Sequence, residues 1–453
     1  MLRIYNTLTH QTEEFKPINP GHVGIYSCGP TVYDYQHIGH MRRYVGDDIL
    51  IRVLKFNEFD VLHVMNITDV GHLISDADTG EDKMEKGAKK FGKSVWDVAK
   101  MFEEQFISSC KKLSIELPKN LMHATDYIKE QIKLIKTLEE KGFTYKTKDG
   151  IYFDALKFGD YFKLSRQNPK ELRAGARVQV VEGKRNVSDF ALWKFSPKNE
   201  KRQMEWESPW GMGFPGWHIE CSAMSMKALG ESFDIHAGGI DHINIHHTNE
   251  IAQSEAATGR HFVNYWVHHN FLTVNGQKMS KSLENTYTVD DVIKRGFDPL
   301  ALRYLYLQTH YRQEMNFTFE ALEAAQNALN RLRKEIAGFD EPKIGCAEFE
   351  GNFLDAINDD LNMPKALSVV WEVLASSYPK SAKAETLFKF DQVLGLSLKN
   401  SKQILQKQEK EMPEEIQKLL EKREVLRKAK KYKEADKLRE KIIKMGFKVE
   451  DTT

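Results

Sequence analysis

The sequence predicts an α/β protein in which helices wind doubly around a parallel sheet, followed by a helical C-terminal region. Val23 and Ile25 alternate with small or polar residues, as in a strand, and residues 28–30 (CGP) end that strand. Apolar residues then recur at helical spacing from Val45 to Phe56, and residues 61–67 form a second apolar run. Strand, helix and strand in this order are typical of a unit with two parallel strands.

The later segments divide into an insertion and a helical end. Residues 121–205 hold helix and strand patterns joined by polar, glycine-bearing segments, which predicts an inserted domain. After Pro299, apolar residues fall on single helix faces: Leu322, Ala325, Leu329, Leu332 and Ile336, then Ala435, Leu438, Ile442 and Met445. Residues 397–413 are polar and rich in Lys and Gln, and we expect a linker there. We expect a sheet domain over 1–120 and 206–298, the insertion over 121–205, a helical bundle over 299–400 and a basic end over 401–453.

Composition excludes several classes of protein. The chain has 453 residues, 41% hydrophobic and 29% charged, and no apolar stretch reaches the roughly 18 residues of a membrane span. The amino terminus lacks the pattern of a secretion signal, so we expect a cytoplasmic protein without a membrane role. Four cysteines lie far apart, at positions 28, 110, 221 and 346, which argues against a disulfide framework. Metal ligation and plain burial both remain open for them.

Charge is distributed unevenly along the chain. The formal net charge is +1, yet residues 401–453 hold 16 Lys and Arg against 11 Asp and Glu. Residues 422–448 are more basic still, with 12 against 4. This end is a candidate for contact with a polyanion such as RNA, and the alternative is a solvated amphipathic helix.

Residues 37–40 (HIGH) lie where the loop after the first strand enters the first helix. In a doubly wound sheet, nucleotides bind at this edge, and the helix amino terminus favours phosphate oxygens. His37 and His40 would share one face, and Gly39 would let an adenine ring approach the backbone. The alternative is a pair of surface histidines around a turn glycine.

Residues 278–282 (KMSKS) follow a third strand pattern at 271–274 and the turn pair Asn275-Gly276. Lysines on such a loop can neutralise triphosphate charge as pyrophosphate leaves, which stabilises the transition state. The alternative is an exposed basic turn. The two short motifs together are far more specific than either one alone.

In this order, the two motifs resemble the paired signatures of the class I aminoacyl-tRNA synthetases. Four further segments resemble the cysteinyl-tRNA synthetase family: residues 28–34 (CGPTVYD), 216–224 (GWHIECSAM), 234–241 (DIHAGGID) and 246–253 (HHTNEIAQ). The resemblance extends from residue 1 to about residue 450. It implies a Rossmann-type nucleotide-binding catalytic domain with an inserted domain, a stem-contact region and helical bundle, and an anticodon-binding tail.

Zinc-type ligands occur within these family-like segments. Thiolate, imidazole and carboxylate all bind zinc, and His246 and Glu250 at i and i+4 would share one helix face. With Cys28 and Cys221, they make a predicted site for one Zn²⁺ per chain. Each residue taken singly fits plain burial as well. The resemblance implies that the substrate thiolate joins this metal, which distinguishes cysteine from serine, although four protein ligands usually indicate a closed structural site.

The resemblance also implies roles for single residues. His37, Gly39, His40 and Lys281 would bind ATP, supplied with Mg²⁺, and the catalytic set would be His37, His40, Lys278 and Lys281. Trp217, Asp241 and Thr68 would contact the amino acid. In the tail, Tyr432, Asp436, Arg427 and Arg439 would contact tRNA, with Tyr432 standing where tryptophan is usual. The expected partners are tRNA(Cys), L-cysteine and ATP, and we expect a monomer.

Three rival functions remain. A ligase that joins activated cysteine to an amino sugar shares this catalytic core, but such relatives lack the long basic tail. A zinc hydrolase built on His246, His247 and Glu250 would lack the HExxH motif. An RNA-binding module without catalysis would leave both phosphate motifs unexplained.

Overall fold

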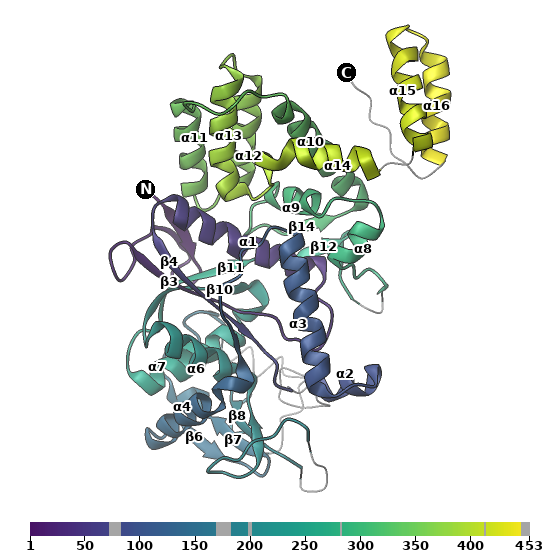
Figure 1. Cartoon of the computed structure of the whole chain (residues 1–453). Coiled ribbons are helices and arrows are strands. Elements are labelled where there is room, and N and C mark those ends of the chain that lie inside the picture. Colours follow the sequence, from purple (N-terminus) through teal and green to yellow (C-terminus); the bar gives the residue numbers. More distant parts are fainter. Residues whose placement is uncertain (72–82, 169–182, 198–201, 281–282, 412–413, 445–453) are drawn as a thin grey trace.

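The computed structural model describes residues 1–71, 83–168, 183–197, 202–280, 283–411 and 414–444 (Figure 1). Its central sheet has five strands, all parallel, in the order β11-β10-β3-β4-β5. The strands are β3 (His22–Ser27), β4 (Asp60–Ile67), β5 (Leu121–His123), β10 (Phe233–Gly239) and β11 (Val263–His269). Helix α1 (Ile38–Phe56) joins β3 to β4. The predicted strand, helix and strand, and the parallel α/β fold, are confirmed.

Helices cover both faces of the sheet because successive side chains of a strand point to opposite faces. Val23 and Ile25 of β3 join one apolar core with α1 and α3 (Val95–Lys112). Tyr26 of the same strand joins a second core with α6 and α7. Helices α6 (Trp217–Leu229) and α7 (His246–Thr258) accordingly lie across the sheet from α1 (Figure 1).

The direction of the strand order reverses between β3 and β10. From β3 the chain continues to β4 and β5 on one side, whereas β10 and β11 extend the sheet on the other. The carboxyl ends of β3 and β10 therefore border the crevice in which open α/β sheets bind ligands. The loop after β3 and the loop after β10 both begin there.

An antiparallel domain is inserted between β5 and α6. Its strands pair in the order β6-β7-β8-β9 and its helix α4 packs against α6. The elements are α4 (Ile128–Glu140), β6 (Thr144–Lys146), β7 (Gly150–Phe153), β8 (Phe190–Phe195) and β9 (Gly213–Pro215). Smaller elements complete this half of the molecule: β1 (Arg3–Asn6), β2 (Gln11–Glu14), α2 (Lys83–Phe91), and a sheet of β12 (Leu272–Val274), β13 (Gln277–Lys278) and β14 (Met315–Phe317).

The region after the sheet domain is helical, as predicted. It comprises α8 (Val289–Lys294), α9 (Pro299–Leu307), α10 (Phe319–Ala337), α11 (Ala347–Asn358), α12 (Met363–Ala375), α13 (Lys380–Leu394) and α14 (Ser401–Glu411). All five residues of the predicted apolar face of α10 are buried. The expected linker over 397–413 is corrected, because its residues 401–411 form α14, which packs on α10. Lys and Gln favour helix as well as solvent, so polarity alone did not distinguish the two.

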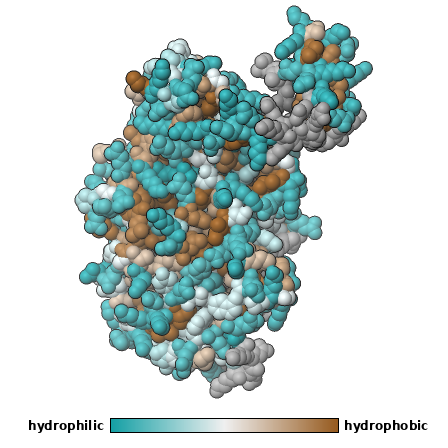
Figure 2. Space-filling view, in the orientation of Figure 1, coloured by the Kyte–Doolittle hydropathy of each residue, from teal (hydrophilic) through white to brown (hydrophobic). Residues whose placement is uncertain are grey.

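A helical hairpin ends the described chain. Its helices α15 (Glu414–Lys428) and α16 (Tyr432–Lys444) pack on each other around the buried Ile416 and Ile442. The hairpin lies apart from the rest of the molecule (Figure 1), and hydrophilic side chains dominate its surface (Figure 2). In the ranges that the structure describes, no helix has both the length and the apolar character that a membrane span needs.

A buried arginine joins the helical bundle to α1. Arg303 of α9 is fully buried and donates to the Asp48 carboxylate of α1 at 2.6 Å. It also donates to the carbonyl of Leu394, the last residue of α13, at 2.6 Å, and to that of Leu113 at 2.9 Å. Four segments that are distant in the sequence therefore meet at one guanidinium group, which fixes the bundle against the sheet domain.

Candidate active site and metal centre

The candidate metal centre lies at the switch point of the sheet. Cys28 directly follows β3, and its N–H donates to the carbonyl of Ala237 in β10 at 3.1 Å. Cys221 comes from α6, whereas His246 and Glu250 occupy the first turns of α7. One donor atom from each of the four lies within 4.8 Å of the other three, and all four residues are buried. The structure therefore brings together the four ligands that the sequence predicted.

The chemistry of this donor set fits a zinc ion. Two sulfurs, one ring nitrogen and one carboxylate oxygen are zinc ligands, and four of them suffice for a tetrahedral site. Glu250 Oε1 lies 3.0 Å from His246 Nε2 but has no hydrogen bond among the described residues. A buried carboxylate needs a compensating charge, which the imidazole of His246 supplies as an ion pair and which a metal cation could supply instead.

Neighbouring histidines contact the candidate ligands. His218 Nδ1 lies 2.9 Å from His246 Nδ1, so a hydrogen bond there leaves Nε2 of His246 for the metal. His236 Nε2 contacts the other oxygen of Glu250, Oε2, at 3.0 Å. The imidazole of His246 and Oε1 of Glu250 are thereby both held toward the two cysteines.

Charge in the cluster is shared between buried groups. Burial would lower the pKa of His246, but Glu250 and Cys221 raise it to about 10. Burial would raise the pKa of Glu250, but His236 and His246 lower it to about 2. The pKa values of both thiols are raised, for Cys28 by burial and for Cys221 by its hydrogen bond with Cys28 and by burial. Without a metal, the cluster therefore holds protons on both sulfurs and on His246.

A second group of donors overlaps the first. Cys28 and Glu250 also lie within 4.8 Å of His236 and His247. His247 is already bonded, through Nδ1, to Nε2 of His268 at 2.7 Å, and its Nε2 lies 3.3 Å from the Cys28 sulfur. The set with Cys221 and His246 has two thiols instead of one. We therefore prefer it as the zinc set and assign His236 and His247 to the surrounding hydrogen bonds.

The three residues expected at the amino acid differ in their placement. Trp217 is half-buried, and its ring lies 4.5 Å from that of His246, so it borders the metal centre directly. The Asp241 side chain is 59% exposed, and its Oδ2 lies 3.8 Å from His242 Nε2. The Thr68 hydroxyl is buried, where it accepts from Asn66 at 3.0 Å and donates to Glu220 at 3.2 Å. Protein groups therefore already use the one donor of the Thr68 hydroxyl and one of its two acceptor positions.

Sequence reasoning missed several residues around this centre. His242 stands between Trp217 and His247, with ring centroids 6.2 and 5.0 Å away, and its Nδ1 has no hydrogen bond in the described chain. His218 and His236 are likewise buried against the ligands. A signal was available, because His218 and His236 lie inside the family-like segments and His242 directly follows one of them. Only the folded structure shows which groups these three histidines contact.

The two phosphate motifs meet in the structure. His37 caps α1: its Nδ1 accepts from the backbone N–H of His40 at 3.2 Å, and the two rings stack at 3.5 Å. A Cβ on Gly39 would lie 2.3 Å from Cε of Met279, so the second motif packs directly on the first. The backbone N–H of Ile38 donates to the carbonyl of Tyr287, just beyond the second motif, at 2.8 Å. Gly39 and Met279 are 240 positions apart in the sequence, so folding brings the two motifs together.

The protonation and exposure of residues in the two motifs follow from their surroundings. Burial lowers the pKa of His37 to about 4, so at neutral pH its ring is uncharged and acts through a hydrogen bond. Lys278 is exposed on β13. Lys281 lies outside the described residues.

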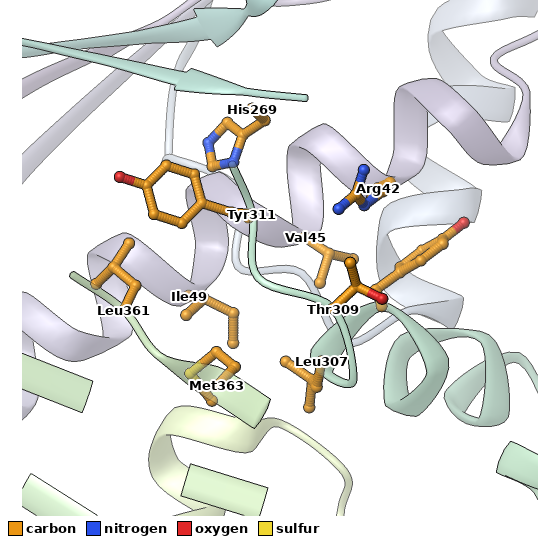
Figure 3. Close-up of a pocket in the computed structure, with 11 residues that line it drawn as sticks. Arg42, Val45, Ile49, His269, Leu307, Thr309, Tyr311, Leu361 and Met363 are labelled. Atoms are coloured by element: carbon orange, nitrogen blue, oxygen red, sulfur yellow. The ribbon is translucent and has the colours of Figure 1, made fainter. Parts of the chain in front are cut away.

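A cavity of about 30 Å³ lies behind α1, between Arg42, Ile49, His269 and Met363 (Figure 3). A volume of this size holds one or two waters, whereas ligand sites measure roughly 300 to 1,000 Å³. It is a packing space and not the substrate site.

The predicted tRNA contacts all lie on the terminal hairpin. Tyr432 is 57% exposed at the start of α16, which also carries Asp436 and Arg439, while Arg427 lies in the last turn of α15. An exposed aromatic ring beside basic side chains is suited to stacking on a base.

Comparison with known proteins agrees with this architecture. Residues 14–327 match the family model of the class I (C) tRNA synthetase catalytic domain, and residues 409–453 match the cysteinyl-tRNA ligase anticodon binding domain. The chain is 49% identical over 452 residues to cysteine–tRNA ligase 1 of Burkholderia lata, covering 100% of this chain and 95% of that protein. It is 44% identical over 483 residues to the Treponema denticola cysteine–tRNA ligase, covering 99% and 98%.

Solved structures show the same fold. Methionyl-tRNA synthetase of Mycobacterium tuberculosis with methionyl-adenylate matches with a TM-score of 0.56 at 16% identity, over 84% of this chain and 91% of that one. Agrobacterium radiobacter LeuRS, in a ternary complex with tRNA and LeuAMS, matches with a TM-score of 0.61 at 12% identity, over 86% and 85%.

The fold and its paired phosphate motifs thus define a class I aminoacyl-tRNA synthetase. Within this class, the identity to relatives over the full length and the matched anticodon binding domain define the family: the chain belongs to the cysteine–tRNA ligases. The family and fold class predicted from the sequence are confirmed.

Proposed function

We propose that the protein activates L-cysteine with ATP and transfers it to the 3′-terminal ribose of tRNA(Cys), releasing pyrophosphate and AMP. The observation that carries this proposal is the meeting of the two motifs at Gly39 and Met279, beside a buried group of zinc-type donors. A site for phosphates and a site for a thiol amino acid thus lie at one edge of one sheet.

The reaction needs orientation and charge stabilisation more than covalent chemistry. In our scheme, the cysteine carboxylate attacks the ATP α-phosphate in line, and pyrophosphate leaves with the Mg²⁺ that accompanies ATP. The neutral rings of His37 and His40 donate hydrogen bonds to phosphate oxygens, and Lys278 and Lys281 neutralise the charge on the leaving group. The adenylate then passes to the tRNA ribose, which in a class I enzyme is expected to react through its 2′-hydroxyl.

Selection of the amino acid rests on the metal centre. Cys28, Cys221, His246 and Glu250 would hold one Zn²⁺, a Lewis acid that binds a thiolate far better than the hydroxyl of serine. Trp217, beside His246, would form a wall of the pocket, with Asp241 at its exposed rim. An apolar pocket by itself separates such small isosteres only by about 10- to 200-fold, so a thiol-specific site makes editing unnecessary.

Recognition of tRNA is assigned to the hairpin of α15 and α16. Its sequence matches the anticodon binding domain, it stands apart from the body (Figure 1), and Tyr432, Arg427, Arg439 and Asp436 lie on it. This hairpin also favours a tRNA acceptor over an amino sugar. A monomeric state and a cytoplasmic location remain predictions, and light scattering during gel filtration tests the first.

Cysteine-dependent exchange of pyrophosphate into ATP tests the activation step, with serine and methionine as controls. We expect exchange with cysteine alone. Charging of total tRNA, followed by sequencing of the charged species, tests the acceptor, and tRNA(Cys) should predominate. Exchange without charging would favour the amino-sugar ligase, and absence of both would refute the proposed reaction.

A further inference from the structure

Arg43 joins the phosphate-binding helix to the loop that carries Cys28. It lies on α1 one turn after Gly39, with only 12% of its side chain exposed. Its Nη1 donates to Oδ2 of Asp47 at 2.8 Å, and its Nη2 donates to the carbonyl of Cys28 at 2.5 Å. The second oxygen of Asp47 contacts Nε2 of His269 at 2.9 Å. The guanidinium group is therefore held by α1 itself and directed at the cysteine loop.

The peptide unit between Cys28 and Gly29 is clamped at both ends. Arg43 binds its carbonyl, and its N–H, which belongs to Gly29, donates to Oδ1 of Asn66 in β4 at 2.7 Å. A Cβ on Gly29 would lie 1.5 Å from the Asn66 carbonyl oxygen, so the loop is pressed directly against β4. Because a peptide unit is planar, two fixed ends determine its orientation and thus where the Cys28 side chain begins.

We propose that Arg43 is a positioning residue that fixes the Cys28 thiol relative to residues 37–40. It thereby sets the distance and orientation of the metal centre and the cysteine site relative to the ATP phosphates. It acts through the Cys28 backbone. The inference rests on the proposed function, since it assumes that Cys28 holds the metal. It extends that function by making one helix responsible for both halves of the reaction: His37, Gly39 and His40 at its amino terminus, and Arg43 toward Cys28.

The same helix supplies a matched control. Arg52 pairs with Asp48 on α1 at 2.8 Å, and its side chain is 9% exposed, close to the value for Arg43. It donates to the carbonyls of Ser114 and Gln392, which lie away from the metal ligands. Arg43→Lys and Arg52→Lys each keep one positive charge beside a buried carboxylate but lose the planar fork, which serves two acceptors for Arg43 and four, including Glu116, for Arg52. Both variants should fold, and only the first should disturb Cys28.

Two measurements test the role without relying on turnover. Zinc release from the purified protein to a coloured chelator should be about 10- to 100-fold faster for Arg43→Lys than for wild type. Cysteine binding, followed by calorimetry without ATP, should weaken by a similar factor. In pyrophosphate exchange, the KM for cysteine should rise and the KM for ATP should stay within about threefold, because the phosphate contacts precede Arg43 on the helix. Arg52→Lys should match wild type in all three.

The results separate the possible failures. Zinc release and cysteine binding within twofold of wild type in Arg43→Lys would overturn the inference. An equal loss in Arg52→Lys would also overturn it, because the effect would then be a general weakening of α1. If wild type shows no cysteine-dependent exchange, the proposed function fails, and the zinc release rates still decide whether Arg43 positions Cys28.

Discussion

The metal centre predicts a steep dependence of zinc affinity on pH. Without metal, the thiols of Cys28 and Cys221 have raised pKa values and the pKa of His246 is about 10, so all three are protonated at neutral pH. The pKa of Glu250 is about 2, so this carboxylate is already ionised. Since zinc binds only the deprotonated ligands, binding should release two protons from sulfur and one from imidazole, which makes three.

The sign and size of the effect follow from this count. Protons compete with the metal, so affinity rises with pH, by about 1,000-fold per unit while all three pKa values exceed the pH. The rise should flatten only when the pH passes the thiol pKa values. Competition with a chelator of known protonation, between about pH 7 and about pH 8, gives the slope. Calorimetry in two buffers with different ionisation enthalpies counts the released protons independently.

Two variants sharpen the measurement. Cys221→Ser removes one proton-releasing ligand, so the slope should fall from about three to about two, and affinity should fall with it. Glu250→Gln removes the carboxylate that raises the pKa of the buried His246, so His246 should lose its proton before zinc binds; affinity should fall, and the slope should drop from about three to about two. A wild-type release of one proton or fewer, or an unchanged slope in Cys221→Ser, would refute this protonation scheme and the four-ligand assignment with it.

Three further predictions address other parts of the molecule. Truncation before Glu414 removes the hairpin, whose helices pack mainly on each other. Pyrophosphate exchange should therefore persist, while tRNA charging should weaken and become less sensitive to salt. Loss of exchange in a folded truncation would contradict the separate roles of hairpin and body. Gly39→Ala would place a Cβ 2.3 Å from Cε of Met279, which is the end of a flexible side chain and can move aside, so activation should slow by less than about 10-fold. Met279→Ala should partly rescue it, and additive losses in the double variant would argue against the contact. Arg303→Met leaves the buried Asp48 without one of its cations and should cost about 3 to 5 kcal/mol, seen as a lower thermal midpoint at fixed scan rate; an unchanged midpoint would show that this junction contributes little.

Local patterns in the sequence predicted the family, the parallel α/β fold and its first elements. The alternation at Val23 and Ile25 and the helical spacing toward Phe56 indicated β3 and α1 because side-chain periodicity reports which face is buried. The spacing of His246 and Glu250 placed both on one face because they lie four residues apart in what proved to be a helix. The paired phosphate motifs and the surrounding segments indicated the family, which the full-length relatives confirm.

Only the tertiary structure determined the contacts between residues that are distant in the sequence. No local pattern places Met279 on Gly39, His218 against His246, or Arg43 on the Cys28 carbonyl, because each contact depends on how the sheet and its crossover helices pack. Polarity likewise suggested a linker at residues that form α14, since the same Lys and Gln side chains suit a solvent-facing helix. The sequence by itself therefore determined which groups could hold ATP, metal and thiol, whereas folding determined their neighbours, and with them the protonation of the site and the peptide that Arg43 clamps.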